Sequence, residues 1–365
     1  VGAIKILRAS GAYWKGDQKN KQLTRIYAIS FPTKDEVKQW VKNREEALKR
    51  DHVILGKKLD LFCTSEVVGK GLPLLTPKGA SIFRTIFRWV QDEELRRGYR
   101  HTKTPCLTKS ELYKISGHWD HYKDDLFSFK AGDDVYALRP MTCPHQFMVY
   151  KRKKYSYREL PIRLAEISEL FRHEQSGELH GLIRLQQFTL ADAHIICRPD
   201  QLEQEFTEVL DLIQHMMKTL NITDYWYRFS KRDDEGTKEK YVDNPKMWKK
   251  TQDDMRNILD KLKVDYVEVS DEAAFYGPKL DVQMRNVFGK EDTAMTIQID
   301  FHMPDRFELE YTDEESKPQR PLVIHRSSVG CIERTMAFLI EHYAGKFPLW
   351  VSPEQVRVLT IADRF

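Results

Sequence analysis

The sequence lacks the features that would place it in a membrane or on a familiar nucleotide-binding scaffold. It has no run of about 18 or more apolar residues, so no membrane-spanning helix is predicted. It contains neither a Walker A loop nor a GxGxxG turn after a strand, so any use of ATP requires a different fold. The first residues form no sustained apolar segment, which argues against a signal peptide. Because no starting Met is present, we expect the chain to begin inside a longer polypeptide.

Cysteine is sparse, and the net charge is small. The five cysteines show no CxxC spacing: Cys63, Cys106, Cys143, Cys197 and Cys331. An odd, dispersed set in a long chain predicts reduced thiols in a cytoplasmic protein. The 59 basic and 55 acidic residues give a net charge of +4, which does not by itself indicate a nucleic-acid partner. The 365 residues are enough for one large domain plus part of another, or for two domains.

Residues 1–58 predict a hairpin followed by a helix. Two apolar runs, AIKIL and RIYAISF, flank a charged segment and indicate two strands. Thr33, followed three residues later by Glu36, has the pattern of a capping box, so we expect one helix from there to about Lys58. Its apolar face is thin and its surface is heavily charged, which is typical of a helix that bridges two parts of a protein.

The remainder predicts an α+β domain. An amphipathic helix over residues 80–98 is followed by a short strand that stops at Pro105. Further amphipathic helices are predicted over residues 200–220 and 331–345. Several segments between residues 225 and 328 alternate apolar and polar side chains with period 2. Because helices are grouped and strands follow one another, we expect a mainly antiparallel sheet flanked by helices. A final strand is predicted after residue 352.

Residues 171–197 predict a β-hairpin that carries two arginines. An Arg-His-Glu sequence leads into a polar loop with two glycines, and apolar and polar residues then alternate imperfectly from Leu182 onward. Arg172 and Arg184 lie on the two arms, where two guanidinium groups can clamp a polyphosphate. For an isolated hairpin, ordinary surface arginines on a half-buried sheet are the simpler explanation.

Three motifs in order resemble those of class II aminoacyl-tRNA synthetases. The unit that ends at Pro105 is similar to the dimer-interface motif, and FRHE with the following loop and Arg184 is similar to the ATP-binding hairpin. VGCIERTMAFLIE is similar to the last class motif. Segments along essentially the whole chain also resemble threonyl-tRNA synthetases, among them KRDHVILGKKLDLF, SGHWDHY, MTCP, SGELHGL and AAFYGPKLD.

This resemblance implies a bacterial-type enzyme that makes threonyl-adenylate from L-threonine and ATP and transfers the threonyl group to tRNA(Thr). It implies a catalytic domain over residues 60–350. Residues 1–59 would be the tail of an editing region with its linker helix, and residues 351–365 the start of an anticodon-binding domain. A cytoplasmic homodimer without a membrane partner is also implied. Two alternatives stay open: a catalytically inactive synthetase-like protein that binds RNA or a partner, and a related class II ligase for serine or proline.

The resemblance assigns one zinc ion to Cys143, His194 and His325. Taken singly, these residues are explained as a buried reduced cysteine and two hydrogen-bonded core histidines. Together, one thiolate and two imidazoles leave a zinc coordination position open, as catalytic sites do. A zinc ion that takes the amine and hydroxyl of threonine would reject valine, which has no hydroxyl. Serine lacks only a methyl group, worth about 1–3 kcal/mol, so serine would require editing elsewhere.

The resemblance also assigns contacts to ATP. Arg172 would meet the α-phosphate and the amino-acid carboxylate, where charge builds during adenylate formation. Glu174 would accept from the adenine amine, and Phe188 would stack on adenine. Three further cations would hold the other phosphates: Arg184, Arg334 and Lys279. We expect Mg²⁺ with ATP, because clustered phosphate charge needs a hard cation.

Four residues would form the threonine pocket by the same resemblance: Met141, Asp192, Tyr276 and Gln298. Asp192 would help to hold the amino group of the substrate. His118 resembles a residue near the terminal ribose of tRNA that assists acyl transfer, although a lone loop histidine is more often structural. The chain departs from the usual family pattern at several positions: His145, Gln146, Gln186, Gln187, Leu190, Ala191 and Thr293.

Overall fold

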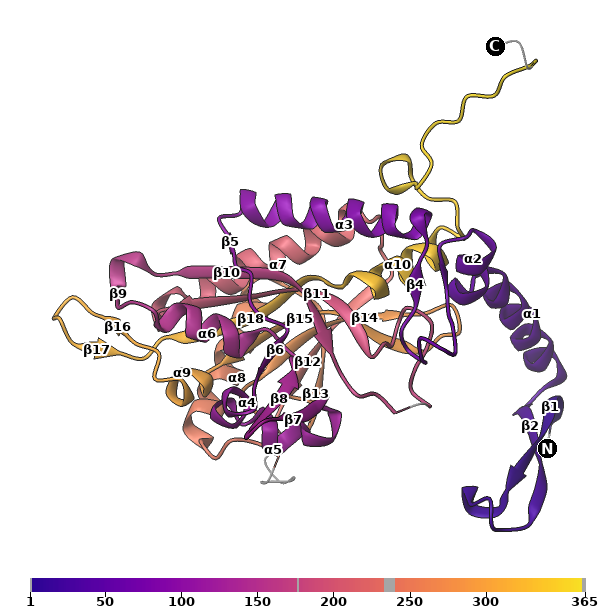
Figure 1. Cartoon of the computed structure of the whole chain (residues 1–365), viewed down its shortest axis with the longest axis horizontal. Helices are drawn as coiled ribbons and strands as arrows, with labels where there is room; N and C mark the ends of the chain where they lie inside the picture. The colour runs from indigo at the N-terminus through magenta and orange to yellow at the C-terminus, as the bar shows by residue number, and fades with distance from the viewer. Residues whose placement is uncertain (1, 176, 233–239, 363–365) are drawn as a thin grey trace.

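The computed structural model describes residues 2–175, 177–232 and 240–362, and one large β-sheet lies at its centre (Figure 1). The sheet has the strand order β13-β12-β14-β15-β18-β11-β10-β5. The bounds, in that order, are Tyr266–Ser270, Tyr225–Lys231, Lys279–Arg285, Glu291–Asp300, Leu322–Cys331, Gln187–Cys197, Ile162–Phe171 and Arg100–His101. Neighbours are antiparallel except at the edges, where β13 is parallel to β12 and β5 is parallel to β10. The predicted α+β class is confirmed, with two parallel edge pairs.

Three helices cover one face of this sheet and enclose the larger hydrophobic core. They are α3 (Pro77–Arg96), α7 (Leu202–Thr219) and α10 (Ile332–His342). α7 packs on β11, β15 and β18, whereas α10 packs on β11, β18 and α3. Strand residues beneath them, such as Ile195, Ile297 and Ile324, are fully buried, and each contributes about 1.5–3 kcal/mol by leaving water. The three helices predicted from amphipathic spacing are therefore confirmed. α8 (Pro245–Lys261) packs against α7.

Short elements pack on the opposite face, around a second apolar cluster. The helices are α4 (Glu111–Ser116), α5 (His118–Tyr122), α6 (Cys143–Lys151) and α9 (Met303–Arg306). The small strands are β6 (Leu107–Lys109), β7 (Ser128–Ala131), β8 (Asp134–Leu138), β9 (Tyr155–Ser156), β16 (Tyr311–Thr312) and β17 (Pro318–Gln319). Phe147 of α6 and Met303 of α9 are fully buried against Leu164 and Val323 of the sheet. This second face carries the candidate site.

The N-terminal segment forms a separate hairpin and two helices. β1 (Ala3–Tyr13) and β2 (Gln22–Phe31) pair with each other in a two-stranded sheet, as predicted. α1 (Lys34–Arg50) begins at the predicted capping box, because the Thr33 N–H donates to the Glu36 carboxylate at 2.9 Å and the Glu36 N–H donates to Thr33 Oγ1 at 3.2 Å. The prediction of one continuous helix is wrong. The Asp51 carboxylate accepts from the Val53 N–H at 2.6 Å and starts a second helix, α2 (His52–Lys58). Two short strands, β3 (Phe62–Cys63) and β4 (Leu74–Leu75), follow.

Two strand predictions need correction. The second arm of the 171–197 hairpin begins at Gln187 and not at Leu182. The intervening apolar residues Leu182, Ile183 and Leu185 are buried, the first two in the larger core, so the loop folds inward instead of continuing the strand. No strand forms over residues 352–362 of the described chain, although one was predicted there. The assignment of residues 1–59 and 351–365 to neighbouring domains stays a prediction.

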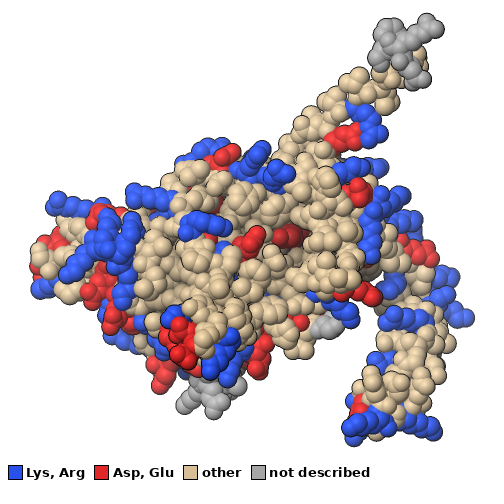
Figure 2. Space-filling view, in the orientation of Figure 1, with Lys and Arg blue, Asp and Glu red and all other residues tan. Residues whose placement is uncertain are grey.

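Charge is unevenly distributed over the surface. In the space-filling view, Lys and Arg side chains gather along α1 and α2 and beside β9, whereas the middle of the viewed face is mostly uncharged (Figure 2). A small net charge therefore coexists with local basic patches. Within the described ranges, no helix is long and apolar enough to cross a membrane.

Candidate functional site

Four polar residues form a row across the second face of the sheet. His194 of β11 lies opposite His325 of β18, His325 lies opposite Gln298 of β15, and Gln298 lies opposite Lys279 of β14. Directly opposed residues on paired strands project from the same face of a sheet. Four residues that are far apart in the sequence, each predicted as part of the site, are therefore side by side.

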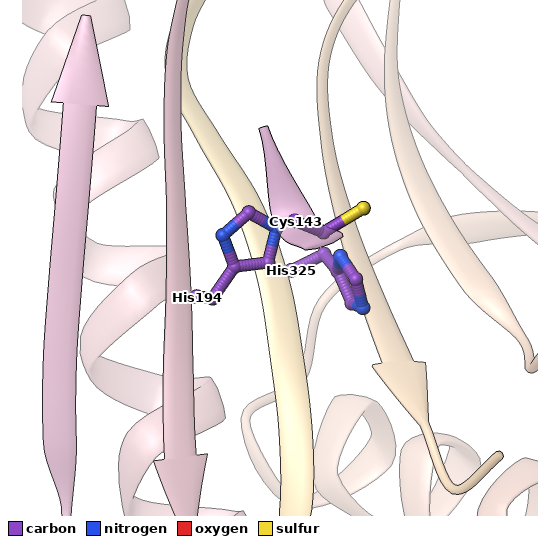
Figure 3. A group of neighbouring side chains, drawn as sticks. All are labelled: Cys143, His194 and His325. Carbon is purple, nitrogen blue, oxygen red and sulfur yellow. The ribbon is translucent and has the colours of Figure 1, made fainter. Parts of the chain in front are cut away.

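Cys143 completes a cluster of metal-donor atoms with the two histidines (Figure 3). It stands in the first turn of α6, and its thiol and the imidazole nitrogens of His194 and His325 all lie within 4.8 Å of one another. The two imidazole rings meet edge to face, with centres 4.6 Å apart. One sulfur and two nitrogens are donors that zinc prefers, and three protein donors leave its fourth position open. The donor set therefore fits the predicted zinc ion.

Each histidine of the cluster has a hydrogen-bond partner on one nitrogen, and the other nitrogen can serve as a metal ligand; that of His194, Nε2, lies 3.9 Å from Asp192 Oδ2. His194 Nδ1 lies 2.6 Å from Gln146 Oε1, and His325 Nε2 lies 2.7 Å from Asp300 Oδ2. The Gln146 amide is oriented by Thr102, because Gln146 Nε2 donates to Thr102 Oγ1 at 2.8 Å. The amide oxygen thus accepts from His194 Nδ1–H and keeps Nε2 unprotonated. Sequence reasoning missed the roles of Gln146 and Asp300. The only sequence features that could indicate them are that Gln146 lies three residues after the predicted ligand Cys143 and that Asp300 stands at the end of a predicted strand.

Replacing Gln146 by Met is expected to weaken zinc binding by roughly 10- to 100-fold, because Met fills the volume but cannot accept from His194. Competition with a chelator of known zinc affinity measures the change. Gln201→Met is the control, since Gln201 is a partly buried glutamine that donates to the Leu160 carbonyl away from the cluster. An unchanged zinc affinity in Gln146→Met would contradict the role of this amide.

Burial controls the charges around the donor cluster. It raises the pKa of the Cys143 thiol well above its usual value and lowers the pKa of the His194 imidazole well below its usual value. Burial also raises the pKa of Asp192 to about 6, on the same strand as His194. The Cys143 thiol and the His194 imidazole are thus neutral before a cation enters, whereas Asp192 is mostly ionised at physiological pH. A divalent cation would favour the thiolate and the carboxylate.

The predicted threonine-pocket residues adjoin the donor cluster. The Tyr276 ring stacks on the His325 ring with centres 5.0 Å apart, and the Tyr276 hydroxyl donates to Gln298 Oε1. Burial raises the pKa of Tyr276, so the phenol remains a donor. Met141 packs beside them in the second apolar cluster. Lys279, predicted near the phosphates, instead pairs with Asp281 at 2.8 Å.

Arg172 connects the donor cluster to the hairpin. It follows the end of β10, and its guanidinium lies 5.1 Å from the centre of the Phe188 ring. Its Nε donates to the carbonyl of Pro140 at 3.2 Å, three residues before Cys143. Within the described residues, no carboxylate forms an ion pair with Arg172, and burial lowers the pKa of the guanidinium. Such a cation is well suited to an anionic ligand.

The other predicted ATP contacts are engaged with protein groups. Arg184 Nη2 lies 2.7 Å from Glu174 Oε2, so Glu174 is paired with a cation instead of being free for adenine. Arg334 Nε donates to the Ile183 carbonyl at 3.0 Å, and its Nη1 donates to the Thr293 carbonyl at 2.7 Å. The structure thus brings Arg334 of α10 to the hairpin loop, where both Arg184 and Arg334 are engaged with protein groups.

His118 lies behind the threonine-pocket residues. It is 2% exposed, its Nδ1 is 2.7 Å from Ser116 Oγ, and its ring centre is 6.5 Å from that of Tyr276. Burial lowers the pKa of His118 to about 3, so the imidazole is neutral at physiological pH.

Sequence comparison finds threonine–tRNA ligases among the relatives of this chain. The family model "tRNA synthetase class II core domain (G, H, P, S and T)" matches residues 125–343. A threonine–tRNA ligase of Clostridium botulinum (strain Eklund 17B / Type B) is 60% identical over 100% of this chain and 57% of its own length. A threonine–tRNA ligase of Anoxybacillus flavithermus (strain DSM 21510 / WK1) is 52% identical over 99% of this chain and 56% of its own length. The chain thus spans just over half the length of these relatives.

Structure comparison agrees. A crystal structure described as the RNA binding domain of threonyl-tRNA synthetase from Cryptosporidium parvum Iowa II has a TM-score of 0.78 and 34% identity, over 83% of this chain and 75% of that chain. Giardia lamblia prolyl-tRNA synthetase in complex with prolyl-adenylate has a TM-score of 0.64 at 14% identity, over 85% of this chain and 56% of that chain, which shows the shared fold. By its matched core domain and its identity to these relatives, the chain belongs to the threonyl-tRNA synthetase family of class II tRNA synthetases.

Proposed function

We propose that this protein activates L-threonine with ATP, forms threonyl-adenylate and pyrophosphate, and transfers the threonyl group to tRNA(Thr). The observation that carries the proposal is the Cys143, His194 and His325 donor cluster beside Tyr276 and Gln298. A hydrophobic pocket alone separates threonine from valine poorly, whereas a site that binds the hydroxyl separates them well. When bound, zinc would supply an electrophilic position for the amine and hydroxyl of threonine.

The protein groups around that position orient the substrate. Gln298 and Tyr276 would line the pocket, Met141 would form its wall, and Asp192 would take the ammonium group. Arg172 would meet both the carboxylate of threonine and the α-phosphate, because its guanidinium has no carboxylate partner among the described residues. The two reacting groups would thus share one cation.

The hairpin groups would take the rest of ATP. Phe188 would stack on adenine, and Glu174 would accept from the adenine amine once Arg184 moves to the phosphates. Arg334 and Lys279 would add positive charge on the outer side, with Mg²⁺ neutralising the phosphates. The pairing of Arg184 with Glu174 supports this exchange of partners, because an exposed ion pair is worth only about 0–1 kcal/mol.

The proposal extends to the assembly. We propose a cytoplasmic homodimer, with residues 60–350 as the catalytic domain and parts of an editing region and an anticodon-binding domain on either side. The short strand β5 at the edge of the large sheet, following α3, supports a dimer contact there. The basic patches along α1 and α2 support contact with the tRNA phosphates (Figure 2).

ATP–pyrophosphate exchange with threonine, serine and valine, before and after zinc chelation, tests the function. Strong exchange with threonine, weaker exchange with serine, none with valine, and loss on chelation support the proposal. No exchange with any of them, on folded and metal-loaded protein, would instead favour an inactive synthetase-like protein. Exchange with serine alone, unaffected by chelation, would keep the fold and change the substrate.

Replacing His118 by Ala is expected to spare adenylate formation and to slow transfer to tRNA by roughly 10²–10⁴-fold, the range of general acid–base catalysis. The imidazole is neutral at physiological pH, but a pKa of about 3 makes it a weak base, so the role requires its pKa to rise when tRNA binds. Single-turnover transfer from preformed threonyl-adenylate measures the step. His342→Ala, on the exposed side of α10, serves as the control. Equal loss of exchange and transfer in His118→Ala would reject the role.

A further inference from the structure

His52 is a buried residue that follows the charged and mostly exposed helix α1. It is the first residue of α2 and is 0% exposed, although most of α1 is in contact with solvent. Its Nδ1 lies 2.6 Å from Glu341 Oε1 on α10, and its Nε2 lies 3.2 Å from the backbone nitrogen of Leu182. A single imidazole thus joins three segments that are far apart in the sequence.

The partners define how this imidazole is protonated. The backbone N–H of Leu182 can only donate, so His52 Nε2 must accept and carries no proton. The proton is therefore on Nδ1, which donates to the Glu341 carboxylate. The second oxygen of Glu341 accepts from the Val287 N–H at 3.1 Å, so both ends of the carboxylate are engaged. Leu182, His52, Glu341 and Val287 are therefore connected by a continuous series of hydrogen bonds.

The loop over residues 177–186 is shaped to receive this imidazole. Gly181 has φ +48°, and a Cβ there would lie only 2.0 Å from His52 Nε2. A side chain at this position would force the loop away from α2. The neighbouring His180 ring meets the His52 ring edge to face, with centres 5.1 Å apart. Loop and helix are therefore in direct contact at the glycine.

The same loop carries and contacts the predicted phosphate-binding cations. Arg184 lies two residues after Leu182, and the carbonyl of Ile183 accepts from Arg334 Nε at 3.0 Å. Arg334 and Glu341 lie seven residues apart on α10, which places them two turns apart on one side of the helix. The middle of the loop is therefore held at consecutive positions, at the Leu182 N–H through His52 and at the Ile183 carbonyl through Arg334.

We propose that His52 is a positioning residue for ATP: it holds the 177–186 loop in place, so that Arg184 and Arg334 are presented to the phosphates. This inference rests on the proposed function, because it assigns these two arginines to ATP. Once Arg334 turns to a phosphate, its bond to Ile183 is lost. The His52 contact with Leu182 then still fixes the middle of the loop. The far end is held separately, since the Gln186 N–H donates to the Gly71 carbonyl at 3.0 Å.

Two variants break the same contact from opposite sides: His52→Ala removes the imidazole, and Gly181→Ala pushes the loop away from it. In both, the KM for ATP in pyrophosphate exchange is expected to rise roughly 10- to 100-fold, because small displacements of binding groups have effects of this size. The KM for threonine and the zinc content should stay at their wild-type values. His342→Ala is the matched control, since it removes an exposed imidazole next to Glu341.

Hydrogen exchange of the amides in residues 177–186 gives a readout that needs no activity. Faster hydrogen exchange in this loop in both variants, together with weaker ATP binding by calorimetry, supports the inference. This holds even if the wild-type protein shows no threonine-dependent pyrophosphate exchange, because that result would reject only the proposed function. Loop exchange and ATP affinity equal to wild type would overturn the role of His52. An equal rise in the KM for ATP and for threonine would also overturn it, because that result indicates general loss of structure.

Discussion

Replacing Cys143 by Ala is expected to remove bound zinc and to lower threonine-dependent ATP–pyrophosphate exchange by roughly a thousandfold or more. A site that binds a substrate hydroxyl through a dedicated group discriminates by about 10⁴–10⁵-fold against a substrate without it, so loss of that group forfeits an effect of similar order. Two histidines alone make an incomplete set of protein ligands for catalytic zinc. His194 and His325 would then remain as a buried pair, with the pKa of His194 held well below its usual value by burial.

Cys197→Ala provides the matched control for this variant. Cys197 is also buried, and it lies on β11 only three residues from His194, but it belongs to the larger core and not to the donor cluster. We expect this control to keep its zinc and its exchange activity, with at most a modest loss of stability from the small cavity. Metal analysis and exchange assays on both variants are the measurements. Full zinc occupancy with full activity in Cys143→Ala would reject the metal site.

The sequence correctly predicted the elements that are stabilised by interactions between residues close together in the chain. The Thr33 and Glu36 capping box was predicted because both halves of the motif are within one helical turn, and it is formed. The helix that ends before Gly98 was predicted because its apolar residues recur at helical spacing and a glycine follows its C-terminus. In both cases the interacting groups are a few residues apart.

Errors arose where tertiary packing overrides local pattern. The apolar residues Leu182, Ile183 and Leu185 alternate as in a strand, but they are buried in an inward-folded loop held by α2 and α10. The expected single helix breaks at Asp51, because its carboxylate accepts from the N–H groups of Val53 and Ile54 and caps a new helix. Alternation and propensity do not distinguish these outcomes, because the deciding contacts are with distant segments.

The site was predictable only in part for the same reason. Period-2 alternation tells which residues share a face of one strand, but it does not specify the register between strands. The pairing of His194 with His325, and of His325 with Gln298, depends on three strands distant in sequence. The resemblance to a family supplied those residues. Gln146 and Asp300, which orient the two histidines, carry only a weak local signal, and their roles became evident from the structure.

Arg172 is the second residue on which a large effect is expected, and the reason is its lack of an acidic partner. Arg172 is half-buried, and a half-buried cation without a counter-ion is unfavourable unless a ligand supplies the missing charge. Within the described part of the chain, Arg172 contacts the Phe188 face and the Pro140 carbonyl, but no carboxylate lies at ion-pair distance. By contrast, the fully buried Arg139 guanidinium pairs with Glu166 at 2.9 Å. Arg172 is thus a cation that an incoming phosphate can neutralise.

Replacing Arg172 by Ala is expected to lower adenylate formation by roughly 10²–10³-fold, the cost of removing one donor from developing transition-state charge. Arg172→Lys should recover little, because an ammonium group keeps the charge but cannot bind carboxylate and phosphate through a planar fork. Zinc content should remain at the wild-type level in both variants, since Arg172 donates to Pro140 and not to a zinc ligand. Arg198→Ala, which removes a surface guanidinium paired with Asp200, is the control and should keep normal exchange. If Arg172→Lys were as active as wild type, a simple point charge would suffice, and the shared contact with carboxylate and phosphate would be wrong.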